Sequence, residues 1–426
     1  MKHDTPHQTF QPGVLRGRVT VAGDKSISHR ALMIAALARG RSEIRNLNRG
    51  ADVAATRDAI VALGASVHEV DGVVYVSGGK LRSPEETIDA RNSGTTVRLL
   101  MGLVAGSGLR ARFDGDASLR RRPMERIAAP LRAMGAQVTT IEGRLPAVVE
   151  GVLRPSGGTF NLPLPSAQVK SSILLAHVSA TSAVRITGDL YSRDHTERML
   201  RLFGAKIEWN GREVTYHPSP LQAATLTVPS DLSAAAFFLV GAAITPGSDL
   251  VLERVGYNPS RTGVIDALKS MGADLTIENQ QEIDGEPVAD LHIRSSKLHG
   301  VTIEGDQVVR AIDEVPVLAV AAACAQGTTV IRGAGDLRAK ESDRLKTIAE
   351  LLTNCGIEVE ELPDGLRIEG GGARSPQGVI ATHDDHRIAM AAATLAAVAG
   401  PIEIDNARVV DISFPGFAAL WKSVQT

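Results

Sequence analysis

Six charged side chains fall within ten consecutive residues in the last quarter of the chain. Residues 336–345 read Asp-Leu-Arg-Ala-Lys-Glu-Ser-Asp-Arg-Leu. Lys340 and Arg344 are four residues apart, so on one helical face they repel each other unless an anion lies between them. The stretch is either a solvated helix start capped by Ser342 and Asp343, or part of a site for an anionic ligand.

Similar polar clusters recur along the chain, each followed by a nearly all-apolar segment rich in Ala and Leu. Free backbone N–H groups at the start of such a helix favour anions, although Ser, Asn and Asp are also ordinary helix caps. The six clusters begin at Asp24, Asn92, Ser166, Ser230, Asp313 and Asp384. Capping alone does not explain the cations in or beside them, which are Lys25, Arg30, Arg98, Arg120, Arg121, Arg122, Lys170, Arg193, Lys340, Arg344 and Arg387.

Two carboxylates in these clusters are candidates for proton transfer. Asp313 and Glu341 each lie beside apolar residues or cations at a predicted helix start. Glu314, next to Asp313, is the competing candidate. His29, His195 and His386 are either orienting donors or structural residues.

Nucleotide and metal sites fit the sequence less well. Residues 23–26 read Gly-Asp-Lys-Ser, in which Asp24 separates the glycine from the Lys-Ser pair of a phosphate loop. Residues 383–387 read His-Asp-Asp-His-Arg, but five consecutive residues at a helix start cannot all face one ion, and Arg387 would oppose a cation. We expect no metal and no organic cofactor.

Composition limits the kinds of partner. The net charge is −2, the pI is near 6.6 and 43% of the residues are hydrophobic, so no global basic field attracts nucleic acid or a membrane surface. Cys324 and Cys355 lie in apolar or helix-like runs and suit reduced thiols. The start of the chain has no apolar signal region, and no run approaches about 18 uninterrupted apolar residues. We therefore expect a cytoplasmic protein.

An internal repeat organises the chain. A leucine-rich helix end followed by a glycine and an alternating strand recurs roughly every 70 residues, with its glycine at Gly64, Gly135, Gly204, Gly272 and Gly356. Together with the six polar clusters, this spacing predicts an α/β protein of six βαβαββ units, with buried helices and outer sheets.

Six units divide most simply into two domains of three. We expect residues 23–240 to form the first domain and residues 241–426, with 1–22, the second. The segment from Leu15 to Val21 reads as a strand that pairs within the second domain, so that the chain crosses between domains near Ala22.

Six ordered motifs together resemble 5-enolpyruvylshikimate-3-phosphate synthases, over roughly Leu15 to Phe417. They are residues 23–30 (Gly-Asp-Lys-Ser-Ile-Ser-His-Arg), 92–98 (Asn-Ser-Gly-Thr-Thr-Val-Arg), 122–124 (Arg-Pro-Met), 166–168 (Ser-Ala-Gln), 340–344 (Lys-Glu-Ser-Asp-Arg) and 385–390 (Asp-His-Arg-Ile-Ala-Met). The resemblance implies a two-domain inside-out α/β barrel, the enolpyruvyl transferase fold, with the active site in the interdomain cleft.

The resemblance also implies the substrates and the residues that bind them. Residues expected to contact shikimate 3-phosphate are Lys25, Ser26, Arg30, Ser166, Gln168, Arg193, Asp313 and Lys340. Residues expected to hold phosphoenolpyruvate are Lys25, Gly94, Arg122, Gln168, Arg344 and Arg387. The implied reaction transfers the enolpyruvyl group to the 5-hydroxyl of shikimate 3-phosphate in the shikimate pathway to chorismate and the aromatic amino acids, with Asp313, Glu341 and Lys25 catalytic.

Some positions differ between this sequence and other members. Residues 411–413, just before Phe414-Pro415, contain no lysine, whereas some members have a lysine shortly before this pair, and Asp336 stands where some have Asn. Gly94 matches the glycine of members sensitive to glyphosate, which implies inhibition by that compound. We also expect a monomer.

Two alternatives remain. UDP-N-acetylglucosamine enolpyruvyl transferase shares the fold and the donor but uses a cysteine in a mobile loop of its first domain, whereas the first cysteine here is Cys324. A non-catalytic anion-binding repeat protein would need the cations, but not Asp313 and Glu341 as titrating groups.

Overall fold

The apolar segment behind each polar cluster forms a buried helix. The structure, a computed structural model, describes residues 6–426. The six helices are α1 (Lys25–Leu37), α3 (Gly94–Gly106), α6 (Ala167–Ala176), α8 (Leu232–Ile244), α11 (Val315–Cys324) and α13 (His386–Ala399). Their Ala- and Leu-rich sequences favour helix, and almost every side chain between their ends is buried. The prediction of internal helices is confirmed.

The chain divides into two compact units. The N-terminal unit comprises Gly23–Val228 and Glu282–Glu286, and the C-terminal unit comprises residues 6–22, Pro229–Gln281 and the rest of the chain from Pro287. The boundary expected at Val240 therefore lies too late. It falls inside α8, which runs unbroken from Leu232 to Ile244 and packs against α11 and α13.

Three four-stranded sheets cover the helices of the N-terminal unit, in the orders β14-β3-β5-β4, β6-β7-β9-β8 and β10-β11-β13-β12. Their strands are β3 (Arg41–Arg45), β4 (Ser66–Val70), β5 (Val73–Ser77), β6 (Ile88–Asp89), β7 (Arg110–Asp114), β8 (Gln137–Ile141), β9 (Arg144–Glu150), β10 (Gly158–Leu162), β11 (Val184–Gly188), β12 (Lys206–Trp209), β13 (Glu213–His217) and β14 (Thr225–Thr227). The connecting helices are α2 (Ala51–Ala62), α4 (Ala117–Arg121), α5 (Glu125–Ala133) and α7 (His195–Leu202).

The C-terminal unit has two four-stranded sheets, β16-β17-β15-β2 and β18-β19-β21-β20, and the two-stranded sheet β1-β22. Its strands are β1 (Gln8–Phe10), β2 (Arg16–Val19), β15 (Asp249–Gly256), β16 (Asp274–Ile283), β17 (Glu286–Arg294), β18 (Thr302–Ile303), β19 (Gly327–Ile331), β20 (Glu358–Leu362), β21 (Gly365–Gly370) and β22 (Ile402–Ile404). Its other helices are α9 (Gly263–Ser270), α10 (Asp306–Ala311), η1 (Gly335–Ala339), α12 (Arg344–Asn354), η2 (Ala407–Ile412) and α14 (Phe417–Val424).

Five repeats have the predicted βαβαββ pattern, and the sixth differs in its second half. In the described chain the sixth repeat ends in η2 and α14 where the others form a hairpin. The repeated glycines Gly64, Gly135, Gly204, Gly272 and Gly356 all have positive φ, between 79° and 101°. They end the second helix of each of the first five repeats in the left-handed conformation that glycine adopts without strain, as predicted.

Two strands are exchanged between repeats. β2 precedes α1 in sequence but pairs in parallel with β15, from Arg16 with Asp249 to Val19 with Leu252. β14 precedes α8 but pairs in parallel with β3. The predicted pairing of the segment before Ala22 within the second domain is confirmed, and β14 is its counterpart at the other crossing.

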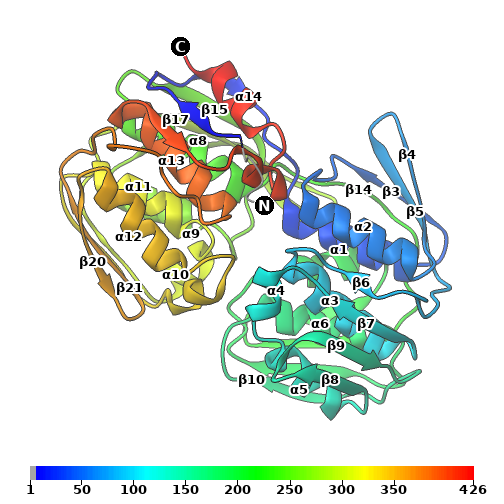
Figure 1. Cartoon of the computed structure of the whole chain (residues 1–426). Coiled ribbons are helices and arrows are strands. Elements are labelled where there is room, and N and C mark those ends of the chain that lie inside the picture. The colour runs from blue at the N-terminus through cyan, green and yellow to red at the C-terminus, as the bar shows by residue number, and fades with distance from the viewer. Residues whose placement is uncertain (1–5) are drawn as a thin grey trace. The chain divides into compact units, whose positions relative to one another are not determined.

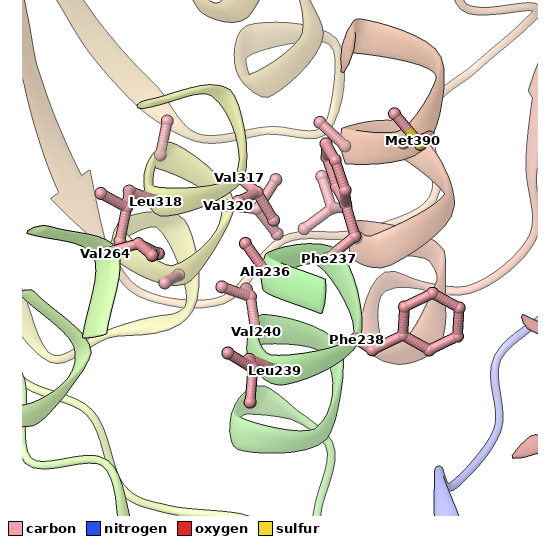
Figure 2. Close-up of a cluster of buried hydrophobic side chains, with 14 of the residues drawn as sticks. Ala236, Phe237, Phe238, Leu239, Val240, Val264, Val317, Leu318, Val320 and Met390 are labelled. Carbon is pink, nitrogen blue, oxygen red and sulfur yellow. The ribbon is translucent and has the colours of Figure 1, made fainter. Parts of the chain in front are cut away.

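The core of the C-terminal unit lies among three helices. Figure 1 shows α8, α11 and α13 inside this unit, with β20 and β21 on one side and β15 and β17 on another. In Figure 2, Phe237 of α8 lies between Val317 of α11 and the helix α13, which carries Met390. Burying each large apolar side chain contributes about 1.5–3 kcal/mol, so this packing fixes where the helix N-termini lie within the unit. Among residues 6–426, no helix is long and apolar enough to cross a membrane.

Candidate active site

The start of α1 places a lysine next to an acid from a neighbouring helix. Asp24 caps the helix, its Oδ1 accepting from the backbone N–H of Ile27 at 2.8 Å. Lys25 is the first helical residue, and its Nζ donates to Oδ2 of Asp52 at 2.8 Å. Asp52 thus fixes the ammonium group at a helix terminus whose N–H groups also favour anions.

A buried arginine follows one turn later. Nε of Arg30 donates to Oγ1 of Thr196 at 2.7 Å, Nη2 to Oγ of Ser171 at 3.0 Å, and Nη1 to the carbonyl oxygen of Ser26 at 2.9 Å. Arg193 donates to Oγ of Ser26 at 3.4 Å. Burial, and then the neighbouring Arg193, lower the pKa of Arg30 to about 10. Two cations close together, one of them with its charged form disfavoured, are stabilised when an anion binds between them.

The start of α3 brings further predicted residues together. Ser93 caps this helix and Gly94 is its first residue. A Cβ on Gly94 would lie 2.8 Å from Nη1 of Arg98 and 3.3 Å from Nη1 of Arg122, so both guanidinium groups flank the glycine. Nη1 of Arg98 donates to Oε1 of Gln168 at 3.0 Å. The glycine leaves backbone N–H groups accessible between two cations, which suits a carboxylate or phosphate.

The remaining predicted residue of this unit lies at the start of α6. The hydroxyl of Ser166 caps the helix by accepting from the N–H of Val169 at 3.4 Å. Behind it, Lys170 and Glu197 form a buried ion pair at 2.7 Å. The predicted residues of the N-terminal unit therefore lie at the N-termini of α1, α3 and α6 or contact residues there.

In the C-terminal unit, one buried arginine organises the charged stretch around residue 340. Arg344 begins α12 and is 1% exposed. Its Nε lies 2.8 Å from Oδ2 of Asp385, its Nη2 lies 2.7 Å from Oε2 of Glu341, and its Nη1 lies 3.6 Å from Oδ1 of Asp313. Burial would lower the pKa of Arg344, but Asp385 and Glu341 outweigh burial and raise it. The solvated reading of this stretch is wrong for Arg344, although Asp343 does cap α12 as that reading expects.

Asp313 lies between two cations. Its Oδ1 is 3.3 Å from Nζ of Lys340 and 3.6 Å from Nη1 of Arg344, and its side chain is 15% exposed. Its carbonyl oxygen accepts from Nη1 of Arg387 at 2.5 Å. Contacts thus link Asp313, Lys340, Glu341, Arg344 and Arg387 into one network.

Asp385 joins the start of α12 to the start of α13. Its carboxylate accepts from Arg344 and from the backbone N–H of Arg387, at 3.0 Å from Oδ1. Burial raises the pKa of Asp385, but the charge of Arg344 outweighs burial and lowers it below its ordinary value. His383 pairs with Glu350 at 2.8 Å. Within residues 6–426 no group of three or more His, Cys, Asp or Glu side chains could hold a metal ion.

Two of the three candidate histidines have structural hydrogen bonds. Nδ1 of His29 lies 2.6 Å from Oγ1 of Thr56, and burial, followed by the charges of Lys25 and Arg30, lowers the pKa of His29 well below 6.5. Nδ1 of His195 lies 2.7 Å from Oε1 of Glu286. These contacts favour the structural interpretation for both.

Two residues beside the predicted site, Arg98 and Asp52, were not among the residues expected to bind the substrates, although Arg98 was noted among the clustered cations. Arg98 is four residues beyond Gly94, so a helical reading would have placed both on one face. No pattern in the sequence indicated Asp52. It lies in α2, in a different part of the repeat from Lys25, and the pairing of Asp52 with Lys25 depends on how α1 and α2 pack.

Repeated α/β units around internal helices, with arginines at the helix N-termini, define the class as proteins of the enolpyruvyl transferase fold. The enolpyruvyl transferase NikO from Streptomyces tendae matches this fold with a TM-score of 0.80 over 99% of this chain and 98% of its own, at 19% identity. The family model for EPSP synthase (3-phosphoshikimate 1-carboxyvinyltransferase) matches residues 10–421.

The similarity continues at the level of sequence. A 3-phosphoshikimate 1-carboxyvinyltransferase from Gloeobacter violaceus is 50% identical over 413 residues, which are 95% of each chain. The EPSP synthase structure from Acinetobacter baumannii is 44% identical, with a TM-score of 0.86 over 98% of each chain. The chain therefore belongs to the EPSP synthase family of transferases.

Proposed function

We propose that this chain transfers the enolpyruvyl group of phosphoenolpyruvate to the 5-hydroxyl of shikimate 3-phosphate, releasing phosphate. Besides the family match, the observation that carries the proposal is the network in which Asp313 and Glu341 contact Lys340 and Arg344. It combines carboxylates for proton transfer with cations for an anionic intermediate.

The substrates explain why cations gather in a chain whose net charge is −2. Together they bring two phosphates and two carboxylates, which need concentrated local positive charge. In the N-terminal unit, Arg30, Arg193 and Ser26, with Lys25, Ser166 and Gln168, would contact shikimate 3-phosphate. Lys25, Gly94, Arg122 and Gln168, with Arg344 and Arg387 of the C-terminal unit, would hold phosphoenolpyruvate.

The reaction proceeds by addition and elimination. The oxygen of the 5-hydroxyl attacks C2 of phosphoenolpyruvate while Asp313 accepts the hydroxyl proton. At the same time, C3 of phosphoenolpyruvate takes a proton from Glu341 or Lys25. The tetrahedral intermediate then loses a proton from the new methyl group and expels phosphate. Lys340, Arg344 and Arg387 stabilise the negative charge, and their placement by Asp313 and Asp385 lowers the cost of reorganisation. No metal or organic cofactor takes part.

The cysteine-dependent alternative finds little support in the thiols of this chain. Cys324 lies at the end of α11, and burial raises its pKa to about 12. Cys355 is buried in the core, and burial raises its pKa to about 11. A thiol with so high a pKa is almost entirely protonated near neutral pH and is a poor nucleophile.

Phosphate release tests the proposal directly. Purified protein is incubated with phosphoenolpyruvate alone, with added shikimate 3-phosphate, or with added UDP-N-acetylglucosamine. We expect release only with shikimate 3-phosphate, and an enolpyruvyl ether of that acceptor by mass spectrometry. Release with the UDP-sugar alone would identify the sister activity, and release with neither would leave an anion-binding protein. Glyphosate inhibition, a monomeric state, a cytoplasmic location and a shared interdomain cleft remain predictions from the sequence.

A further inference from the structure

From the sequence, the adjacent carboxylates of Asp313 and Glu314 are competing candidates for proton transfer. In the structure their side chains have different surroundings. Asp313 faces Lys340 and Arg344. Glu314 is 1% exposed and faces a different pair of cations, Arg261 and Arg387. A buried carboxylate is costly unless it is paired, so its position requires a reason.

Glu314 is held from the side of α8 and α9. The hydroxyl of Ser233 donates a hydrogen bond to Oε1 of Glu314, and Nη2 of Arg261 donates to the same hydroxyl at 2.5 Å. Nη2 of Arg261 also lies 3.6 Å from Oε1 of Glu314 and 3.5 Å from Oδ1 of Asp231. Ser233 and Arg261 therefore fix the carboxylate in one orientation.

The same carboxylate oxygen lies 3.8 Å from Nη1 of Arg387. Nη1 is also the nitrogen that donates to the carbonyl oxygen of Asp313, at 2.5 Å. Asp313 and Glu314 both lie at the N-terminus of α11, and both contact Nη1 of the Arg387 guanidinium. The other two nitrogens of this planar group are Nη2 and Nε. Held in this way, Arg387 can offer Nη2 and Nε to an anionic ligand without a search through its rotamers.

Charge balance explains the presence of Arg261. An uncompensated Glu314 would attract Arg387 and oppose an anion bound there. The cluster contains two acids, Asp231 and Glu314, and two arginines, Arg261 and Arg387. Arg261 and the Ser233 hydroxyl offset much of the charge of Glu314, so that it can orient Arg387 while leaving the arginine attractive to an anion.

We propose that Glu314, held by Ser233 and Arg261, is a positioning residue that orients Arg387 toward the anionic groups of phosphoenolpyruvate. This inference rests on the proposed function, in which Arg387 binds that substrate. It assigns Glu314 a role distinct from that of the base Asp313.

Steady-state kinetics of Glu314→Gln test the proposal, because the amide keeps the shape and removes the charge. We expect the KM for phosphoenolpyruvate to rise about tenfold, with the KM for shikimate 3-phosphate changing less than about twofold. Asp290→Asn is the matched control. Asp290 is a buried acid of the same unit that accepts from the backbone N–H of Arg254 and from Asn279, and its amide variant should leave both KM values unchanged.

A double-mutant cycle separates positioning from general destabilisation. Glu314→Gln should cost little further in an Arg387→Lys background, because the group that it orients has already been replaced. Additive effects, or an unchanged KM for phosphoenolpyruvate in a folded Glu314→Gln protein, would overturn the inference. If this variant does not fold, Ser233→Ala decides, with a several-fold rise expected and an unchanged KM contradicting the proposal. An inactive wild-type protein would instead refute the proposed function.

Discussion

Asp313 is the residue whose surroundings most restrict its role. Its carboxylate lies within 3.6 Å of both Lys340 and Arg344. A carboxylate in this position can accept the hydroxyl proton of an acceptor that binds beside it.

Replacing Asp313 with alanine should lower kcat by about 10²–10⁴-fold while changing the KM of either substrate much less. The reason is that proton transfer is lost while the cations that bind both substrates remain. Single-turnover phosphate release, together with equilibrium binding of shikimate 3-phosphate, checks the expectation. A kcat within a few-fold of wild type would show that another group is the base.

Gly94 is the residue at which an added methyl group would crowd the proposed phosphoenolpyruvate site. Its Cβ would meet the guanidinium ends of Arg98 and Arg122, which can move but would then no longer flank the helix start as they do now. Gly94→Ala should therefore raise the KM for phosphoenolpyruvate several-fold. It should raise the half-inhibitory concentration of glyphosate further and leave the KM for shikimate 3-phosphate unchanged. If Gly94→Ala weakened the binding of phosphoenolpyruvate and of glyphosate equally, it would contradict the prediction that the added methyl group hinders glyphosate more.

At the scale of elements, a series of buried hydrogen bonds links α1, α2 and α3 in the N-terminal unit. Nδ1 of His29 in α1 contacts Thr56 of α2, and Oγ1 of Thr56 contacts Oγ1 of Thr96 in α3 at 2.6 Å. Oγ1 of Thr96 donates to Oγ of Ser93, the cap of α3, at 2.7 Å. This series fixes the helix starts that carry Lys25 and Gly94 relative to one another.

Burial of His29 in this hydrogen-bonded series makes the free energy of unfolding depend on pH. The folded protein keeps His29 neutral because its pKa is lowered, whereas the unfolded chain binds a proton near the ordinary pKa of about 6.5. The unfolded state therefore gains protons as the pH falls below about 6.5, and the free energy of unfolding falls with it.

Thermal unfolding of the wild type and of His29→Gln checks this effect. We expect the Tm of the wild type to drop more between about pH 7.5 and pH 5 than that of the variant, because glutamine does not titrate. His217→Gln, at an exposed position on β13, is the control and should keep the wild-type pH dependence. Equal slopes in wild type and His29→Gln would show that other groups control acid stability.

At the scale of the whole molecule, positive charge is concentrated locally while the total charge is nearly neutral. The net charge is −2, yet buried arginines lie at helix N-termini in both units. Attraction of anionic substrates therefore depends on a few groups and on the ions in solution, since the Debye length is about 10 Å at 0.1 M salt.

Raising the potassium chloride concentration should increase the KM of both substrates while changing kcat less, because salt screens the approach of anions more than contacts in a closed site. Initial rates over a salt series check this expectation, and choline chloride distinguishes screening from a specific effect of potassium. A kcat that falls with salt as steeply as kcat/KM falls would contradict this expectation.

The sequence determined the elements and most of the candidate site residues. Six apolar segments became buried helices because an all-apolar helix has no face to present to water. Five repeated glycines ended helices because only glycine takes positive φ without strain. Polar clusters with cations marked the helix starts because caps and anion sites use the same free N–H groups.

Only the tertiary structure decided where the repeats divide and which charges meet. The boundary expected at Val240 lay too late because helix pattern does not show which core a helix joins, and α8 packs against α11 and α13. Lys25 contacts Asp52, which lies 27 residues further along the sequence. Glu314 contacts Arg261 and Arg387, and these three residues come from three different segments of the chain. A side chain's type and local spacing show that it needs a partner, whereas the partner is selected by how helices far apart in sequence pack together.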